Sequence, residues 1–264
     1  MSLRVASINV NGIRAAMRKG FGAWLARHEP DVLLLQETRA PELTTATLLG
    51  AQWTVHEAVA EHGGRAGVAI ATKSEALDVS LSIGGPQFVG AGRWIEVTNR
   101  LADGVTVCFA SCYVHTGEAS DPDRMKEKYA FLDAIEHRLD ALERQYDYVV
   151  VGGDFNVARA EIDIKNWKGN RGKAGFLEQE RAYFDRWEGQ GWVDLGRQFG
   201  GPGPGPYTWW SYRGRAYDND AGWRIDYLLA SSRLGSRAKD VFVERSASYE
   251  DRWSDHAPVV AVFD

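Results

Sequence analysis

The stretch that decides the fold is Val149-Val150-Val151-Gly152-Gly153-Asp154-Phe155-Asn156. Three consecutive β-branched residues are typical of a buried strand, and the two glycines predict that this strand ends in a tight turn. Asp154 and Asn156 are two residues apart, so their side chains can point into the same space. We therefore expect a carboxylate and an amide just after a buried strand, beside a backbone that a substrate can approach closely. The structural alternative is an Asx turn that closes a loop.

Length and composition favour one domain over residues 1–264, because 264 residues with 44% hydrophobic content can bury one large core. The net charge of −5 argues against a basic protein that wraps nucleic acid, although a local basic groove remains compatible with it. Cys108 and Cys112 would be roughly 13 Å apart on one strand, too far for a disulfide. With no signal-peptide pattern and no apolar run of about 18 residues, we expect a cytoplasmic monomer that does not cross a membrane.

The order of predicted elements indicates an α/β fold. Helices are predicted at 14–28 and 176–188, and the clearest one places Leu132, Ile135 and Leu139 on one face. Besides the stretch at 149–156, strands are predicted at 5–10, 32–35, 53–58, 66–72, 76–83, 93–98, 105–114 and 257–263. This arrangement favours two packed mixed sheets with helices on the outside.

Polar residues stand at the ends or starts of these apolar strands: Asn9, Glu37, Tyr113, Asp154, Asn156, Asp226 and His256. The end of one strand lies beside the start of its antiparallel neighbour, so all seven can meet at one edge. Carboxylates with a single histidine suit Mg²⁺ or Mn²⁺ better than zinc. Such a set suits an anionic substrate, above all a phosphodiester. A purely structural account is costly, because several buried charges would lack a shared partner.

The chain resembles the endonuclease/exonuclease/phosphatase superfamily in four motifs, which are Ser7-Ile8-Asn9-Val10-Asn11-Gly12-Ile13-Arg14, Leu35-Gln36-Glu37-Thr38, Gly153-Asp154-Phe155-Asn156 and Ser254-Asp255-His256. Two further elements are similar to the exonuclease III type of apurinic/apyrimidinic endonuclease: Trp223-Arg224-Ile225-Asp226-Tyr227, and Gly175-Phe176 with Gln179-Glu180-Arg181. The resemblance spans essentially the whole chain. It implies a four-layered α/β-sandwich of the DNase I-like kind.

The resemblance also implies roles for the polar residues. Asp154 would orient or deprotonate the attacking water with support from Asn156. His256, oriented by Asp226, and Tyr113 would contact the scissile phosphate. Glu37 would be the principal Mg²⁺ ligand, with Asn9 beside it and Asp255 at a second or alternate metal position; Mn²⁺ would be a possible substitute.

For DNA, the resemblance implies a pocket for a base-less sugar with Trp209, Trp223 and Ile225 as its walls, and Arg213 inserted into the base stack. Lys165, Lys168, Arg171 and Lys173 are candidates for contacts to backbone phosphates. The structural alternatives are core packing for the tryptophans and solvated loops for the basic residues.

The function implied is a Mg²⁺-dependent repair nuclease acting on double-stranded DNA with abasic sites or blocked 3′ ends. It would cut the phosphodiester 5′ to an abasic site and also act as a 3′–5′ exonuclease that cleans 3′ ends. One alternative is a phosphodiesterase or phosphatase acting on another phosphoester. Another is a DNA-binding module without catalysis, which a metal-titrated cleavage assay would separate.

Overall fold

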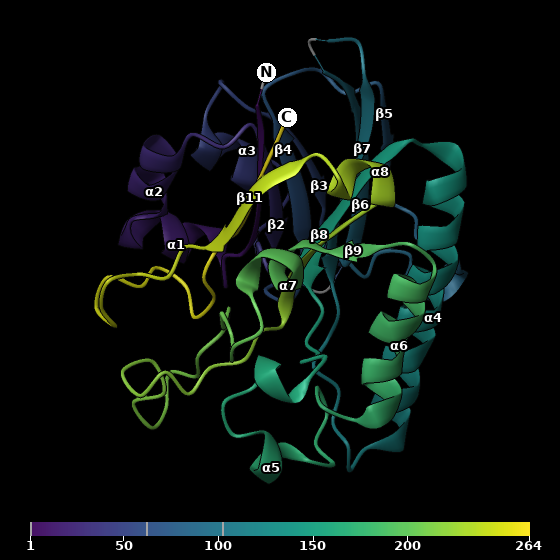
Figure 1. Ribbon diagram of the computed structural model, residues 1–264. Helices are drawn as coiled ribbons and strands as arrows, with labels where there is room; N and C mark the ends of the chain where they lie inside the picture. Colours follow the sequence, from purple (N-terminus) through teal and green to yellow (C-terminus); the bar gives the residue numbers. More distant parts are fainter. Residues whose placement is uncertain (1, 62, 102) are drawn as a thin grey trace.

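The computed structural model describes residues 2–61, 63–101 and 103–264. Two six-stranded sheets lie face to face in the described part of the chain (Figure 1). The first has the order β11-β12-β1-β2-β4-β3 and consists of β1 (Leu3–Asn9), β2 (Val32–Gln36), β3 (Thr54–Ala58), β4 (Val68–Thr72), β11 (Ala238–Val243) and β12 (Val259–Phe263). The second has the order β5-β6-β7-β8-β10-β9 and consists of β5 (Asp78–Ser80), β6 (Trp94–Arg100), β7 (Thr106–Tyr113), β8 (Tyr148–Asp154), β9 (Val193–Asp194) and β10 (Asp226–Ala230).

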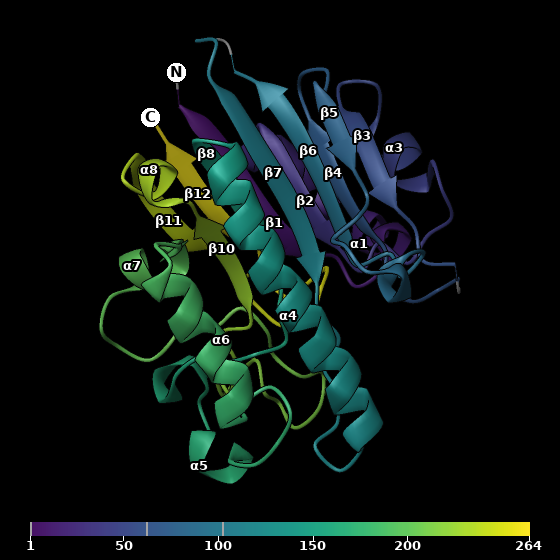
Figure 2. The ribbon, with the colours of Figure 1, turned by 90° about the vertical axis from the view of Figure 1, so that its right-hand side faces the viewer.

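Helices cover the outer faces of both sheets, which confirms the four-layered α/β-sandwich. The first sheet carries α1 (Ile13–Lys19), α2 (Phe21–His28) and α3 (Thr44–Leu49) (Figure 1), and the second carries α4 (Pro122–Gln145) and α6 (Glu178–Gly189) (Figure 2). The shorter elements are α5 (Trp167–Asn170), α7 (Leu195–Gly200), α8 (Ser232–Gly235), η1 (Pro86–Phe88) and η2 (Glu161–Asp163). Among the described residues, we find no helix with the length and apolar character needed to span a bilayer.

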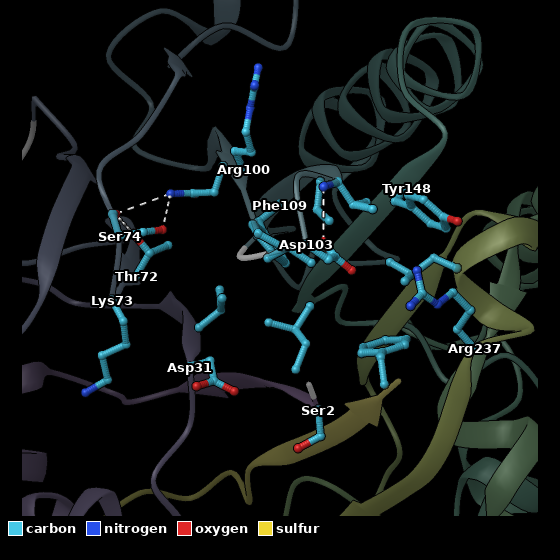
Figure 3. A pocket seen from close by; sticks show the side chains of 18 of the residues that line it. Ser2, Asp31, Thr72, Lys73, Ser74, Arg100, Asp103, Phe109, Tyr148 and Arg237 are labelled. Carbon is cyan, nitrogen blue, oxygen red and sulfur yellow. Dashed lines mark hydrogen bonds between the residues drawn. The ribbon is translucent and has the colours of Figure 1, made fainter.

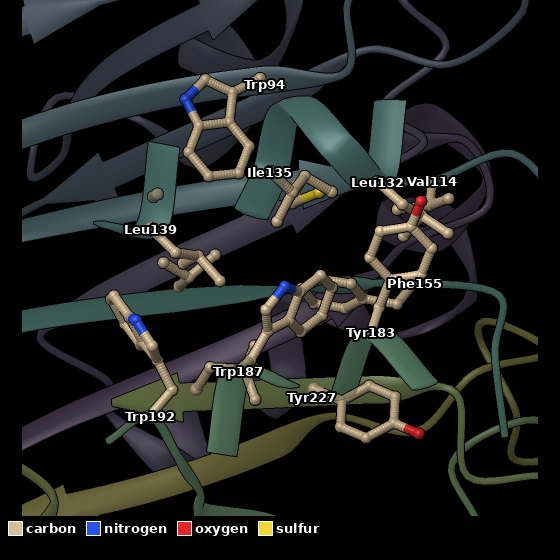
Figure 4. Close-up of a cluster of buried hydrophobic side chains, with 14 of the residues drawn as sticks. Trp94, Val114, Leu132, Ile135, Leu139, Phe155, Tyr183, Trp187, Trp192 and Tyr227 are labelled. Atoms are coloured by element: carbon tan, nitrogen blue, oxygen red, sulfur yellow. The ribbon is translucent and has the colours of Figure 1, made fainter. Parts of the chain in front are cut away.

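Three apolar layers hold the sandwich together, one between the sheets and one between each sheet and the helices that cover it. The central layer packs the inner faces of the sheets against each other, with Leu34 and Ile70 from the first and Phe109 and Val150 from the second. An outer layer beneath α4 and α6 is rich in aromatic rings, including Phe155, Tyr183, Trp187 and Tyr227 (Figure 4). Because the central strands of each sheet are buried on both faces, they read as apolar runs rather than as alternating patterns.

The double glycine has a different role from the one expected. Strand β8 continues through Gly152 and Gly153 to Asp154 instead of ending in a turn before it. A Cβ atom at Gly152 would lie 2.5 Å from Leu34 Cδ1 on the opposite sheet, and one at Gly153 would lie 2.3 Å from Cys112 O. The glycines therefore let the two sheets and strand β7 approach closely, and the space beside them is filled by protein.

Several predicted boundaries were wrong. The helix expected at 14–28 is two helices, because Gly20 with a φ of 121° separates α1 from α2. The strand expected at 76–83 shrinks to the three residues of β5, and α6 begins at Glu178. The sequence reasoning also missed α3, α7 and β11, which are short or half-exposed and carry weak periodicity. Cys108 and Cys112 are free and buried on β7, as expected.

Strand directions bring the polar residues to one end of the sandwich. Strand β1 is parallel to β2, and β7 is parallel to β8, so four strands end on the same side. Strands β10 and β12 are antiparallel to β8 and β1 and therefore start there, with Asp226 directly opposite Asp154. We call this the site end; the chain termini lie at the opposite end (Figure 1).

Candidate functional site

A pocket of about 340 Å³ opens at the site end between the two sheets. Glu37 comes from the loop after β2, Tyr113 and Asp154 from the ends of β7 and β8, and His256 from the residues before β12. Asn156, Trp209, Trp223, Ile225 and Asp255 also line the pocket. Both sheets thus contribute, and most of the residues predicted for the site do meet.

Asn9 lies behind the pocket and joins two carboxylates. Its Nδ2 donates to Glu37 Oε1 at 2.8 Å and to Asp154 Oδ2 at 2.9 Å, and its Oδ1 accepts from the backbone N–H of Asn11. The two amide hydrogens face the carboxylates, so Asn9 fixes the spacing of Glu37 and Asp154 across the two sheets.

His256 is held by Asp226, as the resemblance implies. His256 Nδ1 lies 2.9 Å from Asp226 Oδ2, and the Thr208 hydroxyl donates to the same oxygen at 2.6 Å. Burial lowers the pKa of His256, but the carboxylates of Asp226 and Asp154 outweigh that cost and raise the pKa to about 10. The ring is therefore an imidazolium at neutral pH, suited to contact an anionic oxygen with Nε2.

Asp154 is buried beside other acids. Burial raises the pKa of Asp154; the His256 imidazolium lowers it in part, and the charges of Asp226 and Glu37 raise it further. The carboxyl group accepts hydrogen bonds from the backbone N–H of Asn156 at 2.9 Å and from Asn156 Nδ2 at 3.1 Å. Such a raised pKa is typical of a carboxylate that exchanges a proton near neutral pH.

The residues fit a hard divalent cation. Glu37, Asp154 and His256 each place a ligand-type atom within 4.8 Å of the others. Because His256 is held as a cation, Glu37 and Asp154 are the ligands this group offers, and oxygen ligands suit Mg²⁺ or Mn²⁺. A cation there would also relieve the repulsion that raises the pKa of Asp154.

Arg39 is a site residue that the sequence reasoning missed. It lines the pocket from the loop after β2, and its guanidinium forms an ion pair with Glu37. The signal in the sequence that could have indicated it is the position of Arg39, two residues after the strand-end carboxylate of Glu37. The guanidinium gives Glu37 a counter-charge in the absence of a metal and faces the space where an anionic substrate would lie.

The tryptophan wall follows from strand-like alternation. Trp223 and Ile225 face the pocket while Arg224 between them points inward, where it pairs with Asp163 and Asp194 at 2.7 and 2.8 Å. The rings of Trp209 and Trp223 meet edge to face, with centroids 6.3 Å apart. The neighbouring Trp210 is a core residue that stays 2% exposed, so of this adjacent pair only Trp209 lines the pocket.

Three further polar residues complete the pocket. Asp255 accepts from Asn11 Nδ2 at 2.7 Å and from Trp209 Nε1 at 3.2 Å, so its carboxylate is turned toward the tryptophan wall. Burial raises the pKa of Tyr113, so its hydroxyl stays protonated and can donate to a phosphate. Thr116 reaches Asn156 Oδ1 through its hydroxyl at 3.2 Å.

The basic residues predicted to contact DNA lie outside the pocket. Arg213 is exposed on the loop between Trp210 and Trp223. Four others are exposed around α5 and just before the pocket residues Ala174 and Gly175: Lys165, Lys168, Arg171 and Lys173. Arg171 lies over the Trp167 ring and 3.9 Å from Glu161. Their DNA contacts stay predictions.

Fold and charge arrangement together define a class, the hydrolases that cleave phosphoester bonds with the help of a divalent cation. The chain belongs to the Endonuclease/Exonuclease/phosphatase family, whose model matches residues 6–256. It is 35% identical to an exodeoxyribonuclease of Bacillus subtilis over 97% of this chain and 98% of that protein. It is similar to the structure of an AP endonuclease from Archaeoglobus fulgidus, with a TM-score of 0.84, 29% identity and 99% of each chain covered. A 3′ phosphatase from Neisseria bound to a product DNA hairpin matches with a TM-score of 0.87, 29% identity and the same coverage.

Proposed function

We propose that this protein is a Mg²⁺-dependent nuclease that cleaves double-stranded DNA on the 5′ side of an abasic site. The observation that carries the proposal is the shared pocket, in which Trp209, Trp223 and Ile225 stand beside Glu37 and Asp154. An abasic nucleotide is extruded from the duplex at lower cost than an intact one, because it has lost its base stacking. The apolar walls formed by Trp209, Trp223 and Ile225 would accept a sugar that has lost its base and would hinder a nucleotide that still carries one.

The residues divide the chemistry among them. Asp154 accepts a proton from water as the water oxygen attacks phosphorus. The bond to the upstream O3′ breaks, and O3′ takes up a proton from solvent, which leaves a 3′-hydroxyl. The His256 imidazolium and the Tyr113 hydroxyl donate to the phosphate oxygens as their charge grows. Glu37, with Asp154 beside it, would hold a Mg²⁺ or Mn²⁺ ion, which would supply Lewis-acid stabilisation of that charge.

A second activity is 3′-end processing, which the likeness to a 3′ phosphatase structure favours. The same pocket would receive a 3′-terminal sugar or phosphate, and the exposed basic residues near α5 would contact the phosphates of the DNA backbone. The cytoplasmic location, monomeric state and single domain expected from the sequence stay predictions. So do the DNA-stack insertion of Arg213 and the metal contacts of Asn9 and Asp255.

The test uses Mg²⁺ and two duplexes, one with a single abasic-site analogue and one intact with a recessed 3′ end. Asp154→Asn runs in parallel to show that any cleavage belongs to this protein. Incision confined to the abasic site supports the proposal. Degradation of the intact 3′ end with the abasic site untouched would replace it with a 3′-end processor and remove the assignment of the tryptophan pocket.

A further inference from the structure

The motif Gly175-Phe176 with Gln179-Glu180-Arg181 has no role in the chemistry above, yet it contains a fully buried charge. Glu180 on α6 forms an ion pair with Lys128 on α4, with Nζ and Oε1 2.5 Å apart. Both side chains are 0% exposed, and neither lines the pocket. A buried ion pair so close to the site but outside it requires a physical reason.

Both charged groups are saturated by backbone atoms of the site loops. Besides Glu180, Lys128 Nζ donates to Thr116 O at 2.9 Å and to Asn156 O at 3.0 Å, which uses the three hydrogens of an ammonium group. Glu180 Oε2 accepts from the backbone N–H of Gly175 at 2.7 Å and of Leu177 at 2.9 Å. The pair therefore joins three loops that follow β7, β8 and α5.

These three loops carry much of the site. The first contains Thr116 and follows Tyr113, and the second contains Asn156, which holds Asp154 by two hydrogen bonds. The third brings Gly175 against Trp223, where an added Cβ atom would lie 3.2 Å from Trp223 Cζ3 and 3.0 Å from Asn156 O. A displacement at the pair would reach the attacking group and the tryptophan wall together.

Stability alone does not explain the pair. Burying two charges costs several kcal/mol of desolvation, and apolar side chains of the same volume often stabilise a core as well or better. Burial lowers the pKa of Lys128, which Glu180 only partly offsets. What an apolar pair cannot do is bind the two carbonyl and two amide groups that Lys128 and Glu180 bind.

We propose that Lys128 and Glu180 are positioning residues that clamp the loops at 114–117, 154–158 and 173–177 into one catalytic arrangement. The inference rests on the proposed function for its activity readout. The effect of the pair on the mobility of the loops does not depend on the substrate. The proposed nuclease function and the proposed clamp can therefore fail separately.

The test removes both charges at once, because removing one leaves the other buried without a partner. The variant is Lys128→Met with Glu180→Gln, and Lys128→Gln with Glu180→Gln, which also leaves no buried charge, serves if the first double variant is too unstable. The matched control is Glu136→Gln with Arg186→Met, which removes another ion pair between α4 and α6, at 2.7 Å, that is half-exposed and touches no site loop. Thermal unfolding of each variant first establishes a temperature at which all of them are fully folded.

Two readouts then apply to the folded proteins. Hydrogen exchange at the three loops should speed up about tenfold or more in the clamp variant, with the β7–β8 ladder unchanged, because the loops open locally. Incision of the abasic duplex should lose about 10- to 100-fold in kcat with KM within about threefold, because the reacting groups are misplaced while DNA contacts remain. The control should change neither.

The two readouts separate the possible failures. Unchanged loop exchange in the clamp variant would overturn the proposal, even if the variant is less stable than the wild type. Faster exchange with an unchanged kcat would also overturn it, because the pair would then hold the loops without affecting catalysis. A wild-type protein that does not cut the abasic duplex would refute the proposed function, and loop exchange would still decide the role of the clamp.

Discussion

The two ends of the β-sandwich contain comparable openings built from the same sheets, but their linings differ. At the site end, carboxylates and an imidazolium from both sheets converge on one pocket. At the opposite end, a cavity of about 210 Å³ lies between the sheets (Figure 3), and its buried apolar lining includes Val32, Val107 and Phe109. Lys73, Arg100 and Arg237 lie at its edge, and Figure 3 shows them spread apart rather than directed at one point. The convergence of charge, and not the presence of a cavity, identifies the site.

The difference follows from how the chain uses its strand ends. Strands β1, β2, β7 and β8 finish at the site end, where the last residue of each strand or the residue after it supplies a polar side chain to the site. Burial raises the pKa of Asp154, and the carboxylates of Asp226 and Asp154 raise the pKa of His256 against the effect of its burial. Such clusters destabilise the fold locally and are retained where chemistry needs them.

Removal of the metal should have the largest effect on the activity of the site end. With the divalent cation chelated by EDTA, we expect cleavage to become undetectable and to return with Mg²⁺ or Mn²⁺. Because the pKa of Asp154 is raised in the metal-free protein, Mg²⁺ binding near pH 7 should also release a proton. Calorimetry in buffers of different ionisation enthalpy measures that proton, and full cleavage in excess EDTA would contradict the prediction.

Asp154→Asn should lower kcat for incision about 1,000-fold, because the amide cannot accept the proton of the attacking water. Affinity for the abasic duplex should be retained, since the pocket walls are unchanged. Single-turnover cleavage with a parallel binding titration separates the two. A variant with wild-type kcat would exclude Asp154 as the base.

Asp226→Asn should lower kcat about 100-fold at pH 8 by removing the charge that holds His256 as an imidazolium. In the wild type the pKa of His256 is raised to about 10, so the imidazolium and the activity that needs it persist until the pH rises through that value. In the variant this loss should occur at lower pH. A pH–rate profile checks the shift, and superimposable alkaline limbs would show that Asp226 has another role.

Trp223→Ala should weaken recognition of the abasic site with less effect on chemistry. Removing one wall of the pocket should raise KM for the abasic duplex about tenfold, which corresponds to about 1.4 kcal/mol of lost apolar contact with the sugar. Trp210→Phe is the control, because Trp210 is buried away from the pocket. Equal effects of the two substitutions would locate the abasic sugar elsewhere.

Val107→Ala at the opposite end should have the smallest effect on function. Two buried methyl groups are lost beside the existing cavity, so the free energy of unfolding should fall by about 2 kcal/mol. Incision kinetics of the folded protein should not change. Urea unfolding and the abasic-duplex assay give both numbers, and a reduced kcat would mean that the two ends are coupled.

Sequence reasoning predicted the layers and the site end because both depend on local signals. In the apolar runs that lead to Glu37 and Asp154, a few consecutive residues indicate both a buried strand and the carboxylate at its end. The role of Gly152 was misjudged, since the side chain that excludes a Cβ there, Leu34, comes from the other sheet. Lys128 was not singled out for the same reason, because its partners at 116, 156 and 180 are distant in sequence.

We propose that the carboxylates at the site end hold the divalent cation that assists phosphoester cleavage. Anomalous diffraction from crystals soaked in Mn²⁺ tests it most directly. We predict an anomalous peak within about 2.2 Å of a Glu37 carboxylate oxygen, with Asp154 beside it and none at the opposite end. A fully soaked crystal with no peak at Glu37, or with its peak elsewhere, would contradict this assignment of the metal site.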